Sequence, residues 1–201
     1  MAKLVNDAVI YDFETLSQNP VNGIVINFAA IRYDETRFES NPYTFEELIE
    51  SAHFIKFDTK EQAEVYGRRP DKGTLEWWSK QNAEARSMLD PSDEDVSITE
   101  LYSFCKGISQ QPKRVYTRGN SFDPVFLSQL MIQTGNKEPW AWWNLRDTRS
   151  LIDGMTMGID FDNKFMPENI EGFIHHNPIH DVALDVMRMQ SLYIALRNTN
   201  E

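Results

Sequence analysis

The sequence contains a single cysteine, Cys105, so the chain can form no internal disulfide bond. It also lacks any apolar run of about 18 residues, the minimum for a membrane-spanning helix. Asp7 and Asp12 interrupt the first apolar stretch, which therefore does not resemble a secretory signal peptide. Together these absences predict a protein of a reducing cytoplasm with no membrane partner.

Basic residues are in the minority, with 20 Lys and Arg against 31 Asp and Glu and a net charge of −11. This charge argues against a protein that coats nucleic acid through a broad basic face. It is compatible with an enzyme that grips only a strand end, because bound divalent cations turn an acidic pocket into a phosphate site. The length of 201 residues, 41% of them hydrophobic, predicts one globular domain spanning residues 1–201.

Hydrophobic periodicity predicts an α/β protein. Residues alternate over Val9–Glu14, so we expect a strand there, and turn signals before Ile24–Tyr33 make that run its hairpin partner. Further strands are expected over Phe45–Phe57, Arg114–Arg118 and Trp142–Asp147. Helices are expected over Thr74–Lys80, after Ser97, from Asp123, over Thr148–Asp153 and over Asp181–Arg197, with Asp58–Gly73 and Phe161–Asn177 irregular. This order indicates a mixed sheet with helices packed on it.

Two acidic residues, Asp12 and Glu14, fall on one face of the first strand. Their Cα atoms should be roughly 6–7 Å apart, given the rise of an extended chain. Two such anions on a half-buried face repel each other and lose hydration, and a divalent cation resolves both problems. The alternative is a solvated face of an edge strand.

Two further acidic residues are candidates with competing structural interpretations. Asp123 lies at a helix start, where it can cap the helix, although a carboxylate has two oxygens and can also bind a ligand. Asp185 lies beside the buried stripe of the last helix, so it needs a partner. That partner is either a metal ion or a nearby arginine such as Arg188.

One histidine, His180, precedes Asp185 by five positions, just before the last helix. Its imidazole titrates near neutral pH, so it can serve as a general base, although an ordinary histidine at a helix entry is the alternative. His175 and His176 are interpreted as loop residues without this relation to a carboxylate.

Taken together, these motifs resemble the DEDDh exonucleases, the family of polymerase proofreading subunits, RNase T and oligoribonuclease. The resemblance rests on Ile10–Thr15, Asn120–Asp123 and His180–Asp185. A closer resemblance, to the phage exonuclease A (DexA) and mycobacterial exoribonuclease-like branch, rests on Thr74–Arg86, Pro91–Val96, Asn144–Arg149 and Ile179–Asp181. It covers about Ile10 to Leu196, nearly the whole chain. It implies a ribonuclease-H-like fold and, for a phage protein, the host cytoplasm.

The resemblance implies a 3'-5' exonuclease that releases nucleoside 5'-monophosphates from single-stranded 3' ends. Two divalent cations, Mg²⁺ or Mn²⁺, would be held by Asp12, Glu14, Asp123 and Asp185, with Asp12 bridging them. Their oxygens are the hard ligands that these ions prefer. His180 would accept a proton from the attacking water.

Substrate contacts are expected from side chains around these motifs, namely Phe13, Thr15, Leu16, Asn120, Phe122 and Arg146. Leu16 departs from the glycine usual in proofreading members. Phe13 alternates away from Glu14, so a core position is its alternative. One of Trp77 and Trp78 is a further candidate for base stacking.

DNA is the expected substrate. RNA is the alternative, because recognition of a 2'-hydroxyl needs only one or two polar atoms, which the sequence does not reveal. A non-catalytic module that binds nucleic-acid ends is a second alternative. The sequence leaves open whether the protein works as a homodimer.

Overall fold

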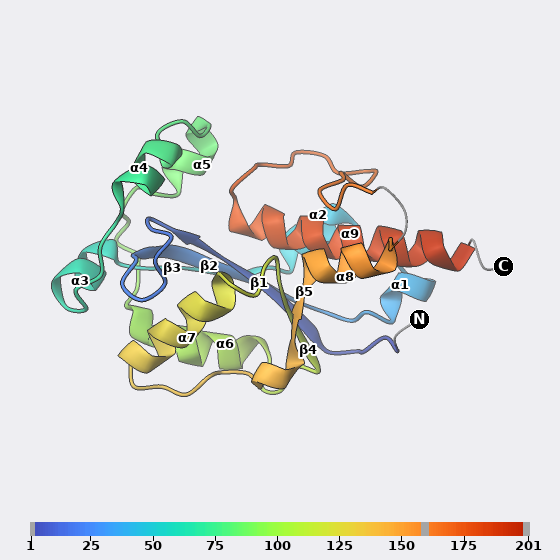
Figure 1. Ribbon diagram of the computed structural model, residues 1–201, viewed down its shortest axis with the longest axis horizontal. Coiled ribbons are helices and arrows are strands. Elements are labelled where there is room, and N and C mark those ends of the chain that lie inside the picture. The colour runs from blue at the N-terminus through green and yellow to red at the C-terminus, as the bar shows by residue number, and fades with distance from the viewer. Residues whose placement is uncertain (1–2, 158–160, 199–201) are drawn as a thin grey trace.

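A five-stranded mixed sheet forms the centre of the computed structural model, which describes residues 3–157 and 161–198 (Figure 1). The strands, in the order β3-β2-β1-β4-β5, are β1 (Ala8–Thr15), β2 (Val25–Tyr33), β3 (His53–Lys56), β4 (Arg114–Thr117) and β5 (Leu145–Asp147). β1, β2 and β3 pair antiparallel, whereas β4 pairs parallel with both β1 and β5. The expected α/β class, the hairpin of β1 with β2 and the β4 strand are confirmed.

Helices cover both faces of this sheet. They are α1 (Arg37–Ser40), α2 (Phe45–Glu50), α3 (Thr59–Glu64), α4 (Lys72–Trp78), α5 (Ala83–Ser87), α6 (Leu101–Ile108), α7 (Asp123–Gln133), α8 (Thr148–Met155) and α9 (Pro178–Asn198), with single 3-10 turns η1 (Ile98–Glu100) and η2 (Trp142–Asn144). Figure 1 shows α6 and α7 on one face and α9, with α1, α2 and α8, on the other. α4 and α5 project from the sheet as a separate arm, residues Lys72–Ser87.

The central strand β1 is buried because it contacts helices on both faces. Val9, Tyr11 and Phe13 belong to the core beneath α6 and α7, and Ile10 belongs to the core beneath α9. This is the predicted alternation of side chains along a strand. Near the C-terminal end of β1 the α9 face changes from apolar to acidic, so the strand carries carboxylates to the edge of the core.

The region predicted as one strand over Phe45–Phe57 is instead helix α2 followed by the short strand β3, so that prediction is wrong. The Thr44 side chain accepts a hydrogen bond from the Glu47 amide and starts the helix, and Leu48 is buried at helical spacing from Phe45. The dense apolar content of the segment hid this period. Asp58–Gly73 is likewise not irregular throughout, since Asp58 caps α3.

Two other boundaries differ from the predictions. The fifth strand begins at Leu145 rather than Trp142, because the residues before it form η2. Helix α9 begins at Pro178 rather than Asp181, because the Asn177 side chain accepts from the Ile179 amide and proline suits a first helical turn. His180 therefore lies within the first turn of α9, not before it.

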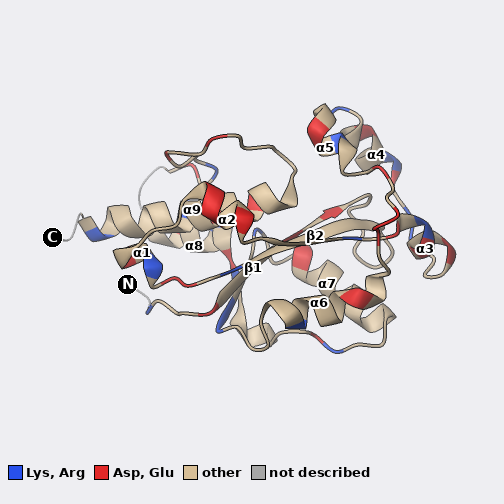
Figure 2. Ribbon diagram, turned by 180° about the vertical axis from the view of Figure 1, so that it is seen from behind, with Lys and Arg blue, Asp and Glu red and all other residues tan. Residues whose placement is uncertain are grey.

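Basic residues do not gather into a single stripe over the described residues. Figure 2 shows Lys and Arg scattered over separate elements, among more numerous Asp and Glu. This distribution agrees with the expectation that a broad basic face is absent. Within residues 3–157 and 161–198, the helices are all too short or too polar to cross a bilayer.

Candidate active site

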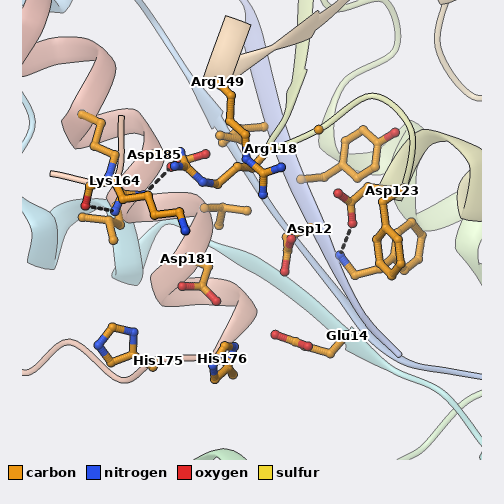
Figure 3. Close-up of a pocket in the computed structure, with 18 of the residues that line it drawn as sticks. Asp12, Glu14, Arg118, Asp123, Arg149, Lys164, His175, His176, Asp181 and Asp185 are labelled. Atoms are coloured by element: carbon orange, nitrogen blue, oxygen red, sulfur yellow. Dashed lines mark hydrogen bonds and ion pairs between the residues drawn. The ribbon is translucent and has the colours of Figure 1, made fainter. Parts of the chain in front are cut away.

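A pocket of about 670 Å³ opens where the acidic end of β1 meets the start of α9 (Figure 3). Its wall includes residues from β1, from the β4–α7 connection, from α8, from the loop before α9 and from α9 itself. The acidic residues of that wall are Asp12, Glu14, Asp123, Asp181 and Asp185. The four predicted carboxylates thus line one pocket, and Asp181 is an additional one.

Asp12 and Glu14 project from the α9 face of β1 into this pocket. Burial raises the pKa of Asp12 well above its ordinary value, and the negative charges of Asp123 and Glu14 raise it further. Burial also raises the pKa of Glu14, assisted by Asp181 and Asp123. Both carboxylates are therefore costly to ionise in the absence of a cation.

Asp123 is the first residue of α7 and is 3% exposed. Phe122 occupies the cap position, so Asp123 does not cap the helix as its position in the sequence suggested. Its Oδ1 instead accepts a hydrogen bond from the Phe13 amide of β1 at 3.1 Å. Burial raises the pKa of Asp123 to about 7, although that hydrogen bond opposes the shift.

Asp185 lies at the inner end of the pocket, where positive groups surround it. Its Oδ1 accepts hydrogen bonds from Arg118 and Arg188, each at 2.8 Å, and its Oδ2 accepts one from the Thr148 hydroxyl at 2.7 Å. The arginine that the sequence allowed as a partner, Arg188, is thus observed, together with Arg118. Both oxygens of this carboxylate are engaged.

His180 contacts the loop before α9 and helix α2. Its Nδ1 accepts a hydrogen bond from the Ile174 amide at 3.0 Å, and its ring packs against Phe45 and Phe173. His180 is not among the described residues that line the pocket. Burial lowers its pKa.

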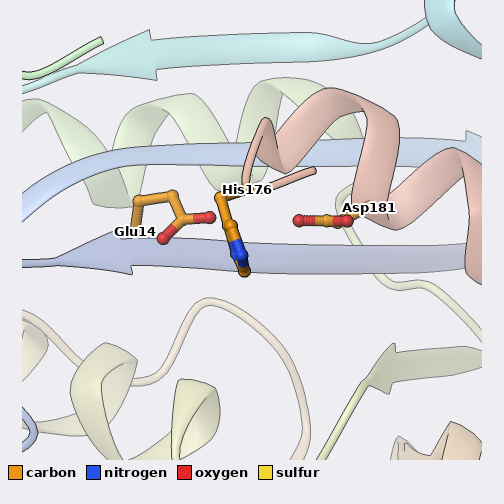
Figure 4. Close-up of side chains that lie close together, drawn as sticks. All are labelled: Glu14, His176 and Asp181. Carbon is orange, nitrogen blue, oxygen red and sulfur yellow. The ribbon is translucent and has the colours of Figure 1, made fainter. Parts of the chain in front are cut away.

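His176 and Asp181 lie beside Glu14 (Figure 4). One ligand atom from each of these three side chains lies within 4.8 Å of the other two. Burial, followed by the charge of Asp185, raises the pKa of Asp181 to about 7. His176 adopts a left-handed backbone with φ of 62°, uncommon outside glycine, and burial lowers its pKa.

The sequence also relates His176 to a carboxylate through its spacing. Four residues separate His176 from Asp181, the same spacing that separates His180 from Asp185. The interpretation that His176 has no such relation to a carboxylate is therefore wrong. The sequence contains two overlapping pairs, and spacing alone does not choose between them.

The wall opposite Glu14 is basic. Arg118, Arg149, Lys164 and Arg188 line the same pocket. Arg118 and Arg188 pair with Asp185 and also bind backbone oxygens of the loop before α9. Figure 3 shows the Lys164 side chain extending into the pocket from that loop.

A groove of about 480 Å³ adjoins the pocket on the side of Glu14. Phe13, Glu14 and Phe122 line both cavities. The groove continues between Thr15 at the end of β1 and Trp77 on the arm. Of the predicted substrate residues, Phe13, Thr15 and Phe122 thus line a cavity.

The other predicted substrate residues have different environments. Leu16 packs with Trp78, Ile26 and Ala85. Asn120 is exposed, and its backbone amide donates a hydrogen bond to the Asp147 carboxylate. The Arg146 guanidinium donates to the carbonyls of Trp143 and Leu145. These three do not belong to the described wall of either cavity.

The family model described as the 3'-5' exoribonuclease Rv2179c-like domain matches residues 7–192. An exodeoxyribonuclease of Enterobacteria phage T4 is 34% identical over 205 aligned residues, which cover 90% of this chain and 86% of the phage protein.

Solved structures of E. coli exonuclease I share the fold. A complex with a 5cy-dT13 oligonucleotide gives a TM-score of 0.60 at 15% identity, covering 98% of this chain and 42% of that one. A zinc-bound complex with single-stranded DNA gives 0.55 at 17% identity, with coverage of 95% and 40%. This chain spans about two fifths of exonuclease I. The likeness confirms the expected ribonuclease-H-like fold.

Proposed function

We propose that this chain, which belongs to the family of 3'-5' exoribonuclease Rv2179c-like domains, is a metal-dependent enzyme that acts on the ends of single-stranded DNA. Membership of this family makes the chain a 3'-5' exonuclease and hence a phosphodiester hydrolase. The observation that carries the proposal is the group of carboxylates around Glu14 in one pocket. Such a group repels a phosphate unless cations neutralise it.

Asp12, Glu14, Asp123 and Asp181 are the side chains that would hold two divalent cations, Mg²⁺ or Mn²⁺. Burial is the largest cause of their raised pKa values, and neighbouring carboxylates add to it, so a cation would stabilise their charged forms; their oxygens also suit these hard ions. Cations there would stabilise the charge that develops on the scissile phosphate. We favour Asp181 over Asp185 because both oxygens of Asp185 already accept hydrogen bonds.

His176 is the residue we propose as general base. Its ring lies beside Glu14 and Asp181, and its lowered pKa keeps the imidazole neutral near pH 7, so one ring nitrogen can accept a proton from water. His180, to which the family resemblance assigned this role, directs its Nδ1 at the Ile174 amide instead. The assignment to His180 stays a prediction that the variants below compare directly.

The two sides of the pocket support the polarity of cleavage. A 3'-exonuclease holds the continuing strand, with its phosphates, on one side of the scissile bond and a single nucleotide on the other. Arg149 and Lys164 on one side suit the phosphates of the strand. The groove beside Thr15 and Trp77 contains no lysine or arginine among its described lining residues, and it suits the last nucleotide.

DNA is the proposed substrate because the phage relative is an exodeoxyribonuclease at 34% identity. RNA is the second candidate, because the family model is described as an exoribonuclease domain. The proposed ligands and base all come from one chain, so this site needs no second subunit. By analogy with the phage relative, we propose the host cytoplasm as the place of action.

The test is release of nucleoside 5'-monophosphates from matched single-stranded DNA and RNA oligonucleotides. We expect release with Mg²⁺ or Mn²⁺, none with chelator, and none from a strand whose 3' terminus is blocked. Cleavage of closed circular single strands would show an endonuclease instead. Faster release from RNA would replace DNA by the second candidate.

A further inference from the structure

Trp77 is a large aromatic side chain that the fold leaves partly uncovered. It is 41% exposed, whereas its neighbour Trp78 is 2% exposed. Trp78 packs in the cluster with Ile26 and Ala85, and its Nε1 donates a hydrogen bond to the Thr15 carbonyl at 2.9 Å. Trp78 therefore attaches the arm to the end of β1. The arm does not depend on Trp77 for these contacts.

The attachment of the arm holds Trp77 in a fixed place. Asp71 caps α4, and its carboxylate also accepts from the Gln18 amide beyond the end of β1. The Asp71 amide donates to the Leu16 carbonyl. Backbone and side-chain bonds thus join the start of α4 to the residues that follow Glu14. An aromatic ring on such a support loses little conformational entropy when it binds a ligand.

The ring of Trp77 forms one wall of the groove beside the carboxylates. The other apolar walls are Phe13 and Phe122, and the charged residues among the described lining are both acidic, Glu14 and Asp71. A groove with aromatic walls, and without a lysine or arginine among its described lining residues, favours a flat, uncharged group over a phosphate. A nucleobase is such a group, and bases stack on aromatic side chains.

We propose that Trp77 stacks on the base of the 3'-terminal nucleotide and so contributes to the recognition of the strand end. The inference rests on the proposed function, which places the last nucleotide in this groove. Stacking needs a base that is free of its complement, so Trp77 would favour unpaired ends. It would recognise every base, because each offers a flat face.

Trp77 also contacts His176, with ring centroids 4.6 Å apart and an interplanar angle of 78°. Its loss could therefore slow the reaction through the histidine as well as weaken binding of the base. The two effects differ in their dependence on the substrate. An effect through His176 acts on any strand, whereas an effect through stacking requires a base on the terminal nucleotide.

The experiment pairs a change in the protein with a change in the substrate. Single-stranded DNA oligonucleotides ending in a normal or an abasic residue, each with a last linkage that resists hydrolysis, are titrated in Mg²⁺ with wild type, Trp77→Ala and Trp77→Phe. Fluorescence anisotropy of a 5' label gives the affinity. Trp143→Ala is the matched control, since Trp143 is 63% exposed but lies on η2, outside the groove.

We expect Trp77→Ala to weaken binding of the normal end about 5- to 100-fold, the range for loss of one base–aromatic stack. Binding of the abasic end should change less than about two-fold, and Trp77→Phe should retain most of the affinity. Equal losses on both ends, or no loss on either, would overturn the proposal. The assay needs no hydrolysis, so failure of the proposed activity would appear separately, as absent nucleotide release by wild type.

Discussion

Two pairs of histidine and aspartate overlap at the start of α9, and their surroundings differ. Asp181 lies near Glu14 and His176, with one ligand atom of each side chain within 4.8 Å of the other two, a separation that suits one metal ion. One helical turn further on, Asp185 is enclosed by Arg118, Arg188 and Thr148. The spacing in the sequence is the same in both pairs. This difference supports our proposal that Asp185, paired with two arginines, belongs to the fold, whereas Asp181, which forms no ion pair within the described part of the chain, is available for a metal ion.

The largest effect is expected from substitution of Asp181, which we propose as a metal ligand. We expect Asp181→Asn to lower the rate of nucleotide release by about 10³-fold or more, because it removes a negative ligand from the metal site. The measurement is kcat on a single-stranded DNA oligonucleotide in saturating Mg²⁺, with circular dichroism to show that the variant is folded. Wild-type activity in folded Asp181→Asn would remove Asp181 from the site.

The histidines give a second contrast. His176→Ala should cost about 10²–10⁴-fold in rate, the range for loss of a general base, while metal binding remains. In wild type the rate should rise with pH through the ionisation of His176, and its lowered pKa should move this limb to lower pH than for an ordinary histidine.

His180→Ala is the matched control for this experiment. It should keep the pH limb and most of the activity, because His180 binds the Ile174 amide and packs on Phe45 outside the pocket wall. Loss of the limb in His180→Ala, with the limb kept in His176→Ala, would return the role of base to His180.

How much of this arrangement the sequence could predict depends on the range of the interactions. The alternation of Val9–Glu14 and the turn after it are local signals, so β1, its hairpin and the acidic pair were predictable. The preference that we propose for Asp181 over Asp185 in the third motif was not predictable, because it rests on the contact of Asp185 with Arg118, 67 positions away. No local pattern reports an ion pair across that separation.

Other elements show the same division. Helix α2 was mistaken for a strand because its apolar residues are dense enough to obscure their period, and the Thr44 cap is a weaker signal than that density. The helix cap that the sequence allowed for Asp123 is not formed, and its partner is instead the amide of Phe13, 110 positions away, which no local pattern could indicate.

Stability provides a third way to sharpen the comparison. Asp185→Asn should lower the free energy of unfolding by about 3–5 kcal/mol, because it leaves the largely buried Arg118 and Arg188 without their anion. Urea unfolding at neutral pH in chelator measures this, and Asp181→Asn should show no comparable loss. Equal destabilisation by both variants would contradict the division between a structural and a functional aspartate.

The pH dependence of stability gives a further contrast. Burial raises the pKa of Asp123 and Asp181 to about 7 in the folded state, above their values in the unfolded chain. Between those values the folded state binds more protons, so these two groups make stability fall as pH rises from about 4 to 7. Thermal unfolding of the metal-free protein should show this fall, and Mg²⁺ or Mn²⁺ should oppose it.

Asp123→Asn tests the cause of that fall. The variant keeps an oxygen to accept the hydrogen bond from the Phe13 amide but carries no charge. Its stability in chelator should therefore depend less on pH than that of wild type, and it should be the more stable protein at pH 8. A variant that is less stable than wild type at pH 8 would show that the Asp123 carboxylate does not destabilise the metal-free fold.

Metal affinity tests the central distinction between the two aspartates most directly. Calorimetric titration of Mn²⁺ into wild type, Asp181→Asn and Asp185→Asn, each shown to be folded, compares the two positions without any nucleic acid. We predict that Asp181→Asn loses at least one of the binding events seen in wild type, whereas Asp185→Asn binds Mn²⁺ with nearly wild-type affinity. Loss of binding in Asp185→Asn together with intact binding in Asp181→Asn would contradict the account.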